Sequence, residues 1–446
     1  MSLAVELIQY LMIMLIGIYT YYSFSIFRYK NKTQQNKAFT ALTIIIFLIH
    51  FIGYATLLLQ IQSMKLVYLY AGEAVMFLLV LLLNRIFYPR LSKLLLRNML
   101  MLLAVGFIVL TRLSYEDAVK QAVIVGGTFI IALFVPFFIM KLQFLGKYGW
   151  VYGILGIAVL LVVLIIGRTS FGATNWLSIY GISVQPSEIV KLLFVFSIAA
   201  LLSEEIKLKR LLFITVMAGA NVLILVLQKD LGGALIFFVT FIFMLYAATV
   251  RPLYLFTGLL GGSFAAFIAY RLFYHVRVRV IAWQKPFQYI DKEGFQITQS
   301  LFAIGTGGWF GMGINRGLPT GIPVVESDFI FSAISEEMGG LFAICIILIY
   351  ISCFIMMVNI SLNQEEGFYR LLSLGFSVMF AFQVILSIGG VIKFIPSTGV
   401  TLPFISQGGS SILMIIVMFM IIQGIHIRGR AGMNKIDSRP DKEEIH

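Results

Sequence analysis

Asp328 is the carboxylate in this sequence whose surroundings best suit acid–base chemistry. It lies in the run Glu-Ser-Asp-Phe-Ile-Phe at 326–331, where a long apolar stretch begins. A carboxylate in a partly dry site can have its pKa raised toward that of a useful general base. The neighbouring Glu326 could raise it further, because like charges resist joint ionisation. Spacing alone equally allows that Asp328 only favours a helix N-terminus through the helix dipole.

A second charged group lies in the run Gln-Pro-Ser-Glu-Ile-Val-Lys at 185–191. Glu188 and Lys191 are three residues apart, so they can pair on one face of a helix. Ionisable groups within a membrane are costly and are functional candidates by default. Lys191 could therefore hold an anionic head group, although a pair that merely neutralises itself explains the spacing equally well.

Asp230 lies in the run Gln-Lys-Asp-Leu-Gly-Gly at 228–233, in a connection too short for an ordinary loop between two apolar stretches. Two half-buried helix ends could meet around this carboxylate. Alternatively, Asp230 caps the N-terminus of the second helix. Both interpretations stay open on the sequence alone.

The polar stretch between Arg271 and Asp328 holds further candidates. Arg279 belongs to an alternation of arginine and valine, with Gln296 and a glycine-rich run at 305–313 farther along. Basic residues interleaved with aromatic ones suit the phosphates of lipid head groups. Anchoring at the membrane interface predicts the same pattern.

The elements that must position these side chains are helices in a membrane. Hydrophobic residues make up 60% of the 446 positions and charged residues 12%, and the mean hydropathy is +0.98. A soluble protein of this size would need more charge to cover its surface, so we expect lipid to cover it. Helices are the open-ended structures that satisfy their own backbone in lipid. We predict an all-α polytopic membrane protein with about 13 transmembrane helices, near 3–27, 39–62, 66–84, 98–112, 119–140, 149–167, 187–203, 211–227, 231–249, 254–271, 328–358, 370–392 and 408–427.

The net charge of +13 does not indicate nucleic acid, because the basic residues form short clusters between the apolar runs. Placing most of the 33 lysines and arginines on the cytoplasmic side predicts an outer N-terminus and a cytoplasmic C-terminus. The first apolar stretch is too long for a signal peptide and is expected to stay as a span. Cys345 and Cys353 fit neither a metal site nor a disulfide framework, and we interpret them as packing residues.

The chain divides most naturally after its third span. The basic segment 85–97 separates the first three spans from the rest. Within those spans, His50 and Glu73 are expected to pair between neighbouring helices, or to face the bundle, rather than to do chemistry. We therefore predict an N-terminal extension at 1–97, a ten-helix core at 98–430 with a large outer loop at 272–327, and a disordered cytoplasmic tail at 431–446.

Five separated blocks resemble the SEDS family of cell-wall glycan polymerases, which includes FtsW, RodA and SpoVE. The blocks are Gly-Ala-Thr-Asn-Trp-Leu at 172–177, the run at 185–191, Gln-Lys-Asp-Leu-Gly at 228–232, Asp-Phe-Ile-Phe with Glu-Glu-Met-Gly within 328–339, and Thr-Gly-Val-Thr-Leu-Pro-Phe-Ile-Ser-Gln-Gly-Gly-Ser-Ser at 398–411. They follow the family's order. The resemblance implies the family's ten spans with both termini cytoplasmic, which correspond to spans 4–13 here.

The resemblance implies a peptidoglycan glycosyltransferase that polymerises lipid II into glycan strands on the outer face of the cytoplasmic (inner) membrane. The family's essential aspartate corresponds to Asp328, its lysine to Lys191 and its outer-loop arginine to Arg279. Asp328 would act as the general base while a sugar hydroxyl displaces the lipid diphosphate with inversion. The other expected substrate-binding residues are Glu188, Asp230, Gln296, Glu326 and Ser410.

Cofactors and partners follow from the same resemblance. Positive charge from Lys191 or Arg279, or a bound divalent cation, could stabilise the departing diphosphate. The sequence has no dedicated metal motif, so the cofactor stays unknown. Besides lipid II, nascent glycan strands and membrane lipid, a class B penicillin-binding protein is the implied transpeptidase partner.

The sequence departs from the family's pattern near the expected site. Asn175 stands where the family usually has arginine, Lys229 where it has proline, and Lys285 where it has aspartate. Glu326 replaces a histidine that often precedes the aspartate. These departures keep open a second function, a non-catalytic scaffold for a transpeptidase. The charges of Glu188, Lys191 and Asp230 near membrane depth keep open a third, a flippase or transporter for a lipid-linked precursor.

Overall fold

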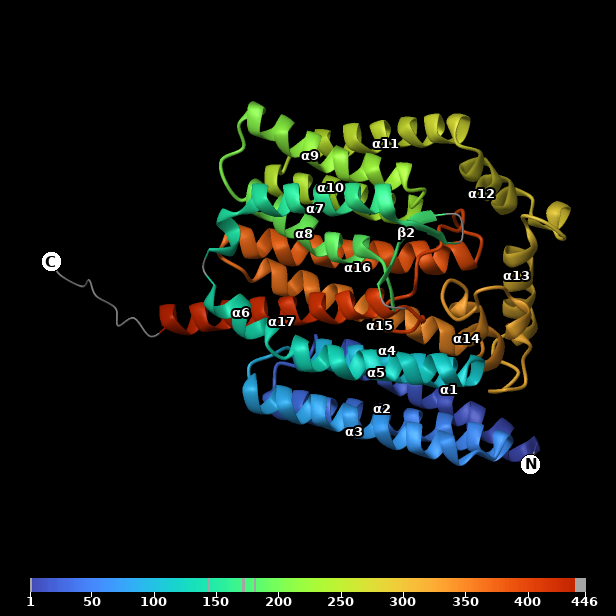
Figure 1. The fold of residues 1–446 in the computed structure, drawn as a ribbon. Helices are drawn as coiled ribbons and strands as arrows, with labels where there is room; N and C mark the ends of the chain where they lie inside the picture. The colour runs from blue at the N-terminus through green and yellow to red at the C-terminus, as the bar shows by residue number, and fades with distance from the viewer. Residues whose placement is uncertain (1, 143, 171–172, 180–181, 438–446) are drawn as a thin grey trace.

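The structure, a computed structural model, describes residues 2–142, 144–170, 173–179 and 182–437 (Figure 1). Among these residues, twelve helical segments are long and apolar enough to cross a membrane. The long helices run side by side in one bundle, and their exposed faces carry large apolar side chains. The protein is therefore a multi-pass helical membrane protein, as its hydropathy predicts.

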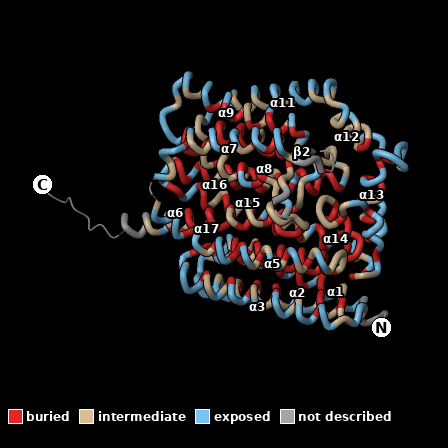
Figure 2. Tube along the Cα trace, viewed as in Figure 1, coloured by how far each residue is buried: buried red, intermediate tan, exposed pale blue. Residues whose placement is uncertain are grey.

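The N-terminal extension forms three helices on one side of the bundle: α1 (Ser2–Ser25), α2 (Lys32–Ile61) and α3 (Met64–Phe87). Of these, α2 packs against α4 (Lys93–Leu113), α1 against α15 (Gly340–Leu362) and α3 against α5 (Tyr115–Ala132). Of the most apolar segment of α4, 94% is buried, because the extension covers one face and the other helices cover the rest (Figure 2). Gly53 permits this packing, since a Cβ at that position would lie 2.5 Å from Cδ1 of Ile108.

Polar side chains join the extension to the core within the membrane. Asn98 of α4 accepts hydrogen bonds from the hydroxyls of Tyr19 (3.0 Å) and Ser23 (2.8 Å) on α1.

Within the extension, the predicted pair of His50 on α2 and Glu73 on α3 is confirmed, with 2.8 Å between Nε2 and Oε2 and side chains that are 0% and 1% exposed. These contacts pair polar groups that would otherwise be costly in lipid.

The remaining long helices form the core. Span 119–140 is divided into two helices near Pro136, and the expected span at 187–203 is a helix of 17 residues. Together with α4, the core contains α5 (Tyr115–Ala132), α6 (Val135–Lys141), α7 (Gly149–Ile166), α8 (Pro186–Leu202), α9 (Leu208–Leu227), α10 (Leu231–Thr249), α11 (Pro252–Leu272), α15 (Gly340–Leu362), α16 (Gly367–Val391) and α17 (Gly409–Asp437), with the short η1 (Leu145–Lys147) before α7.

The predicted span at 328–358 is present, but its predicted start is wrong. A short helix, α14 (Ile330–Met338), ends at Gly339, and the long helix α15 begins only at Gly340. Gly339 has φ +91°, and a Cβ there would lie 2.5 Å from the backbone nitrogen of Gly311. Glycine is favoured in such a conformation because it has no Cβ to clash. Hydropathy misses this break because the apolar residues at 329–334 and those from 341 onward read as one run across it.

The predicted outer loop is largely structured. It contains α12 (Tyr274–Gln284), η2 (Pro286–Tyr289), α13 (Phe295–Gly307) and η3 (Pro319–Gly321). These elements and α14 lie at one end of the bundle (Figure 1). α1 begins at this end, and α17 ends at the opposite one.

A small antiparallel sheet, which the sequence did not predict, lies between α7 and α8. Its strands are β1 (Arg168–Ser170), β2 (Ala173–Ile179) and β3 (Ile182–Val184), in the order β1-β2-β3. Trp176 lies opposite Arg168, and Leu177 lies opposite Val184. The sequence analysis assigned no element to this polar connection, where the strands pair their own backbone.

The predicted tail also differs from the structure. α17 continues to Asp437, so residues 431–437 are helical rather than disordered. Residues 438–446, the rest of the predicted tail, lie outside the described residues.

Candidate active site

Asp328 lies in a turn directly before α14, and its side chain is partly exposed. Two hydrogen bonds from the C-terminal block hold this turn. The backbone N–H of Gln407 donates to the carbonyl of Glu326 at 2.8 Å. The hydroxyl of Ser406 donates to the carbonyl of Ser327. The backbone of the candidate base is thus fixed while its carboxylate remains accessible.

Arg279 and Gly399 lie beside this carboxylate. Arg279 is on α12, and its Nη1 donates to the carbonyl of Ser397 at 3.2 Å. Gly399 has φ +72°, and a Cβ there would lie 3.3 Å from Oδ2 of Asp328 and 3.9 Å from Nη2 of Arg279. The backbone at Gly399 therefore adjoins both charges, and the absence of a side chain leaves space between them.

The electrostatics of the site favour a proton acceptor. Burial is the main cause that raises the pKa of Asp328, whereas the Ser327 hydroxyl and the positive charge of Arg279 lower it. Repulsion from Glu326, which the sequence suggested, is not what raises it. Burial also lowers the pKa of Arg279, against the attraction of Asp328 and Asp230. A raised carboxylate pKa next to a cation is typical of functional sites.

Lys191 and Glu188 form a buried pair in α8. The ammonium donates to both carboxylate oxygens of Glu188, at 2.9 and 3.0 Å, and to Oε1 of Gln383 at 3.2 Å. Gln383 in turn donates to the carbonyl of Thr401 at 3.1 Å. The pair is therefore joined to the segment that carries Gly399.

Asp230 is the N-cap of α10, which confirms the second interpretation of its sequence. Its carboxylate accepts hydrogen bonds from the Gly233 N–H (2.8 Å), from Nδ2 of Asn175 (3.0 Å) and from Nε2 of Gln185 (3.4 Å). Asn175 belongs to β2, so this carboxylate ties the sheet to the start of α10. Asp230 also attracts Arg279 and so belongs to the same charged group.

The other predicted binding residues are not gathered at Asp328. The hydroxyl of Ser410 accepts a hydrogen bond from the backbone N–H of Gln185 at 3.3 Å, at the start of α8. Gln296 is exposed on α13. The backbone of Glu326 helps to hold the Asp328 turn, and its side chain is partly exposed.

Two site residues were missed by the sequence analysis. Gly399 belongs to the block at 398–411, in which only Ser410 was singled out. His275 lies one turn before Arg279 on α12, and its Nε2 is buried without a hydrogen-bond partner in the described structure. A glycine with positive φ has no mark in sequence beyond its type, so only the motif could have indicated Gly399.

Among the described residues, no group of three or more histidine, cysteine, aspartate or glutamate side chains could hold a metal ion. The guanidinium of Arg279 attracts the carboxylates of both Asp328 and Asp230. The arrangement can accept a proton at Asp328 and stabilise a nearby anion at Arg279.

A family model described as "Cell cycle protein" (FtsW, RodA, SpoVE) matches residues 92–431 of this chain. RodA of Mycobacterium tuberculosis, named a peptidoglycan glycosyltransferase, is 34% identical over 300 residues, covering 63% of this chain and 64% of the relative. Stage V sporulation protein E of Bacillus subtilis is 30% identical over 348 residues, covering 73% of this chain and 94% of the relative. The match thus spans slightly less than two thirds of the length of RodA.

Solved structures share the fold. A chain of a peptidoglycan synthase complex aligns with TM-score 0.65 at 24% identity, over 75% of this chain and 97% of that chain. RodA of Thermus thermophilus aligns with TM-score 0.58 at 22% identity, over 75% of this chain and 96% of that chain. The family match begins one residue before α4, so α1, α2 and α3 lie outside it. From α4 onward, this chain belongs to the FtsW/RodA/SpoVE family of cell cycle proteins.

Proposed function

We propose that this protein is a peptidoglycan glycosyltransferase that polymerises lipid II, with Asp328 as the general base. The observation that carries this proposal is that the Asp328 carboxylate and the Arg279 guanidinium both lie close to the backbone at Gly399. Burial raises the pKa of the carboxylate, so that it accepts a proton more readily than an exposed aspartate does. The relatives named peptidoglycan glycosyltransferase support the same reaction.

The reaction is a single displacement with inversion. The acceptor's sugar 4-hydroxyl oxygen attacks the anomeric carbon of the donor and forms the new glycosidic bond. The bond between that carbon and the diphosphate oxygen breaks, and the lipid diphosphate leaves with the electron pair. Asp328 takes the hydroxyl proton as the nucleophile attacks, and one carboxylate suffices for such an inverting step.

Arg279 is the residue best suited to stabilise the departing diphosphate. It is partly exposed, lies beside Asp328 and carries a guanidinium that can bind phosphate through two hydrogen bonds. Lys191 is buried and bound by Glu188 and Gln383, so we assign it a supporting role. Asp230 and Ser410 bind backbone N–H groups at the starts of α10 and α8, and Glu188 neutralises Lys191.

The proposal includes an orientation and a partner. The basic clusters predict that the end of the bundle with α12, α13 and α14 faces outward from the cytoplasmic membrane. Lipid-linked precursor would then be consumed on the outer face. A class B penicillin-binding protein is the proposed transpeptidase partner, in line with a similar chain that belongs to a peptidoglycan synthase complex.

The decisive experiment supplies lipid II to the purified full-length protein in detergent and measures glycan chains. Asp328→Asn should lower the rate by about 10²–10⁴-fold, the usual contribution of a general base. Asp291→Asn is the matched control, since Asp291 is exposed in the same outer segment. It should leave the rate unchanged.

The outcomes separate the three candidate functions. Normal polymerisation by Asp328→Asn, with an unchanged unfolding temperature, would exclude Asp328 as the base. Transport of lipid II across liposomes without polymer would favour the flippase. Full complementation of a deletion strain by Asp328→Asn would favour the scaffold.

A further inference from the structure

The N-terminal extension contacts one particular segment of the core, the loop 308–318. The side-chain amide of Gln9, on α1, donates to the carbonyl of Phe310. The side-chain amide of Gln60, on α2, donates to the carbonyl of Ile314 at 2.9 Å. The ring of Tyr10 packs edge-on against Phe310, with 5.5 Å between centroids. Two helices of the extension therefore bind the backbone of one loop.

The opposite face of this loop is bound to α14. The N–H of Met312 donates to the carbonyl of Glu336, and the N–H of Gly313 donates to the carbonyl of Glu337, both at 2.9 Å. The N–H of Leu318 donates to Oε1 of Glu336, also at 2.9 Å. The loop therefore occupies the space between the extension and the short helix that follows Asp328.

Arg112, at the end of α4, completes the connection. Its Nε contacts Oε1 of Glu337 at 2.9 Å, and its Nη2 donates to the carbonyl of Gly317 at 3.2 Å. One guanidinium thus binds both α14 and the loop. Because these partners are largely buried, movement of the loop would break charged hydrogen bonds and is costly.

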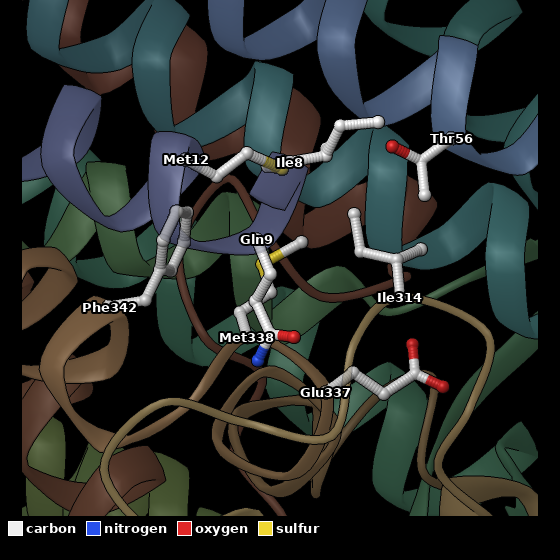
Figure 3. A pocket seen from close by; sticks show the side chains of 8 residues that line it. All are labelled: Ile8, Gln9, Met12, Thr56, Ile314, Glu337, Met338 and Phe342. Atoms are coloured by element: carbon white, nitrogen blue, oxygen red, sulfur yellow. The ribbon is translucent and has the colours of Figure 1, made fainter. Parts of the chain in front are cut away.

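The junction leaves almost no free space. A cavity of about 10 Å³ remains among α1, α2, the loop and α14, at most the volume of one water molecule. Figure 3 shows Ile8, Met12 and Thr56 of the extension on one side of it and Glu337 on the other. Close-packed contacts of this kind transmit displacement, since there is no space to absorb it.

These contacts are additional to the family fold, because the family match begins only at residue 92. We propose that α1 and α2 hold the loop 308–318 against α14 and thereby position Asp328, with Gln9 and Gln60 as positioning residues. This inference rests on the proposed function. It assigns the extension a part in the reaction rather than in membrane anchoring alone.

The test replaces both amides with apolar side chains of similar size, in the double variant Gln9→Leu/Gln60→Leu of the full-length protein. Gln34→Leu is the matched control, because Gln34 is exposed at the opposite end of α2. Hydrogen exchange of the backbone amides in 309–318 and 332–338 is measured without lipid II. Exchange should accelerate roughly fivefold for each hydrogen bond that is lost.

The second readout is the kinetics of glycan formation. Misplacing a catalytic group lowers kcat, whereas residues distant from the substrate leave its KM unchanged. The double variant should therefore show a reduced kcat, roughly tenfold, at an unchanged KM for lipid II. Gln60→Lys keeps a donor for the Ile314 carbonyl and should retain most of the activity.

Each outcome decides the inference. Faster exchange in 309–318 and 332–338 together with a reduced kcat supports it. Unchanged exchange overturns it, because the loop is then held without the extension. Faster exchange with an unchanged kcat also overturns it, since the loop would not position the base. A wild-type protein that makes no polymer rejects the proposed function, and the positioning role with it, while the exchange data still report on the contact itself.

Discussion

Two charged regions of the core differ in how their charges are satisfied. In α8, Lys191 donates to both oxygens of Glu188 and to Gln383 within 3.2 Å. At the end of the bundle, Asp328 and Arg279 attract each other beside Gly399, and in the described part of the chain no direct ion pair joins them. The first region is closed, whereas the second leaves a carboxylate accessible.

The difference separates structural charge from charge that is available for chemistry. A buried pair whose hydrogen bonds are all made is costly to break and offers nothing to a substrate. A carboxylate with a raised pKa and a nearby cation can exchange a proton and stabilise an anion. We therefore expect substitutions in α8 to affect folding first, and substitutions around Asp328 to affect turnover first.

The largest effect on stability is expected from Glu188→Gln. It leaves the buried Lys191 ammonium without its counter-charge, which typically costs about 3–5 kcal/mol. Chemical unfolding in detergent measures this loss. The double variant Glu188→Gln/Lys191→Met removes both charges and should recover much of it. A single variant as stable as the wild type would mean that the pair is not structural.

The next effect is expected from Gly399→Ala, which combines a strained backbone at φ +72° with a Cβ 3.3 Å from the Asp328 carboxylate. A small displacement of a catalytic group can lower turnover about 100-fold. Gly305→Ala on α13 is the control, because a Cβ there meets nothing within 4 Å. Equal turnover in the two variants would show that Gly399 is not needed to position the Asp328 carboxylate.

A smaller change is expected in the pH dependence of turnover. A general base must be deprotonated, so activity falls as the pH drops through the pKa of Asp328. Burial raises that pKa and Arg279 lowers it, so Arg279→Gln should raise it further and move the acid limb of kcat/KM to higher pH. An acid limb that moves to lower pH would contradict the assignment. Asp291→Asn should leave the limb in place.

The smallest effect is expected from Asn175→Ala. It removes one of three donors to the Asp230 carboxylate and should lower stability by about 1.5 kcal/mol. The N–H of Gly233 and the amide of Gln185 remain as donors, so α10 keeps its cap. A shift in unfolding temperature without a change in KM for lipid II would show that Asn175 acts through the fold alone.

Much of the fold could be predicted because the bilayer imposes requirements that short stretches of sequence meet by themselves. A span needs a sufficiently long apolar run, and Lys and Arg set its direction, so neighbours in the chain carry most of the information. Twelve spanning helices among the described residues follow from this rule. The rule fails at Gly339, where a contact with Gly311, distant in the chain, ends the helix.

The candidate site was predictable only in part. Asp328 and Arg279 were identified from ordered motifs, and the structure places both beside Gly399. Motifs could not show that Ser410 serves the start of α8, because that depends on which backbone groups come within hydrogen-bonding distance. The N-cap role of Asp230 was one of two interpretations that the sequence left open. The sheet between α7 and α8 was missed because its strands are short and carry no hydrophobic periodicity that distinguishes them from a loop.

The sequence by itself determined the membrane class, most of the spans and the identity of the candidate base. Hydropathy and residue type are properties of the chain, and they do not depend on how the helices pack. Only the tertiary structure decided which carboxylates are satisfied and which loop the extension holds. Those answers depend on contacts such as Gln60 with Ile314, between residues far apart in the chain, and no local pattern encodes such a distance.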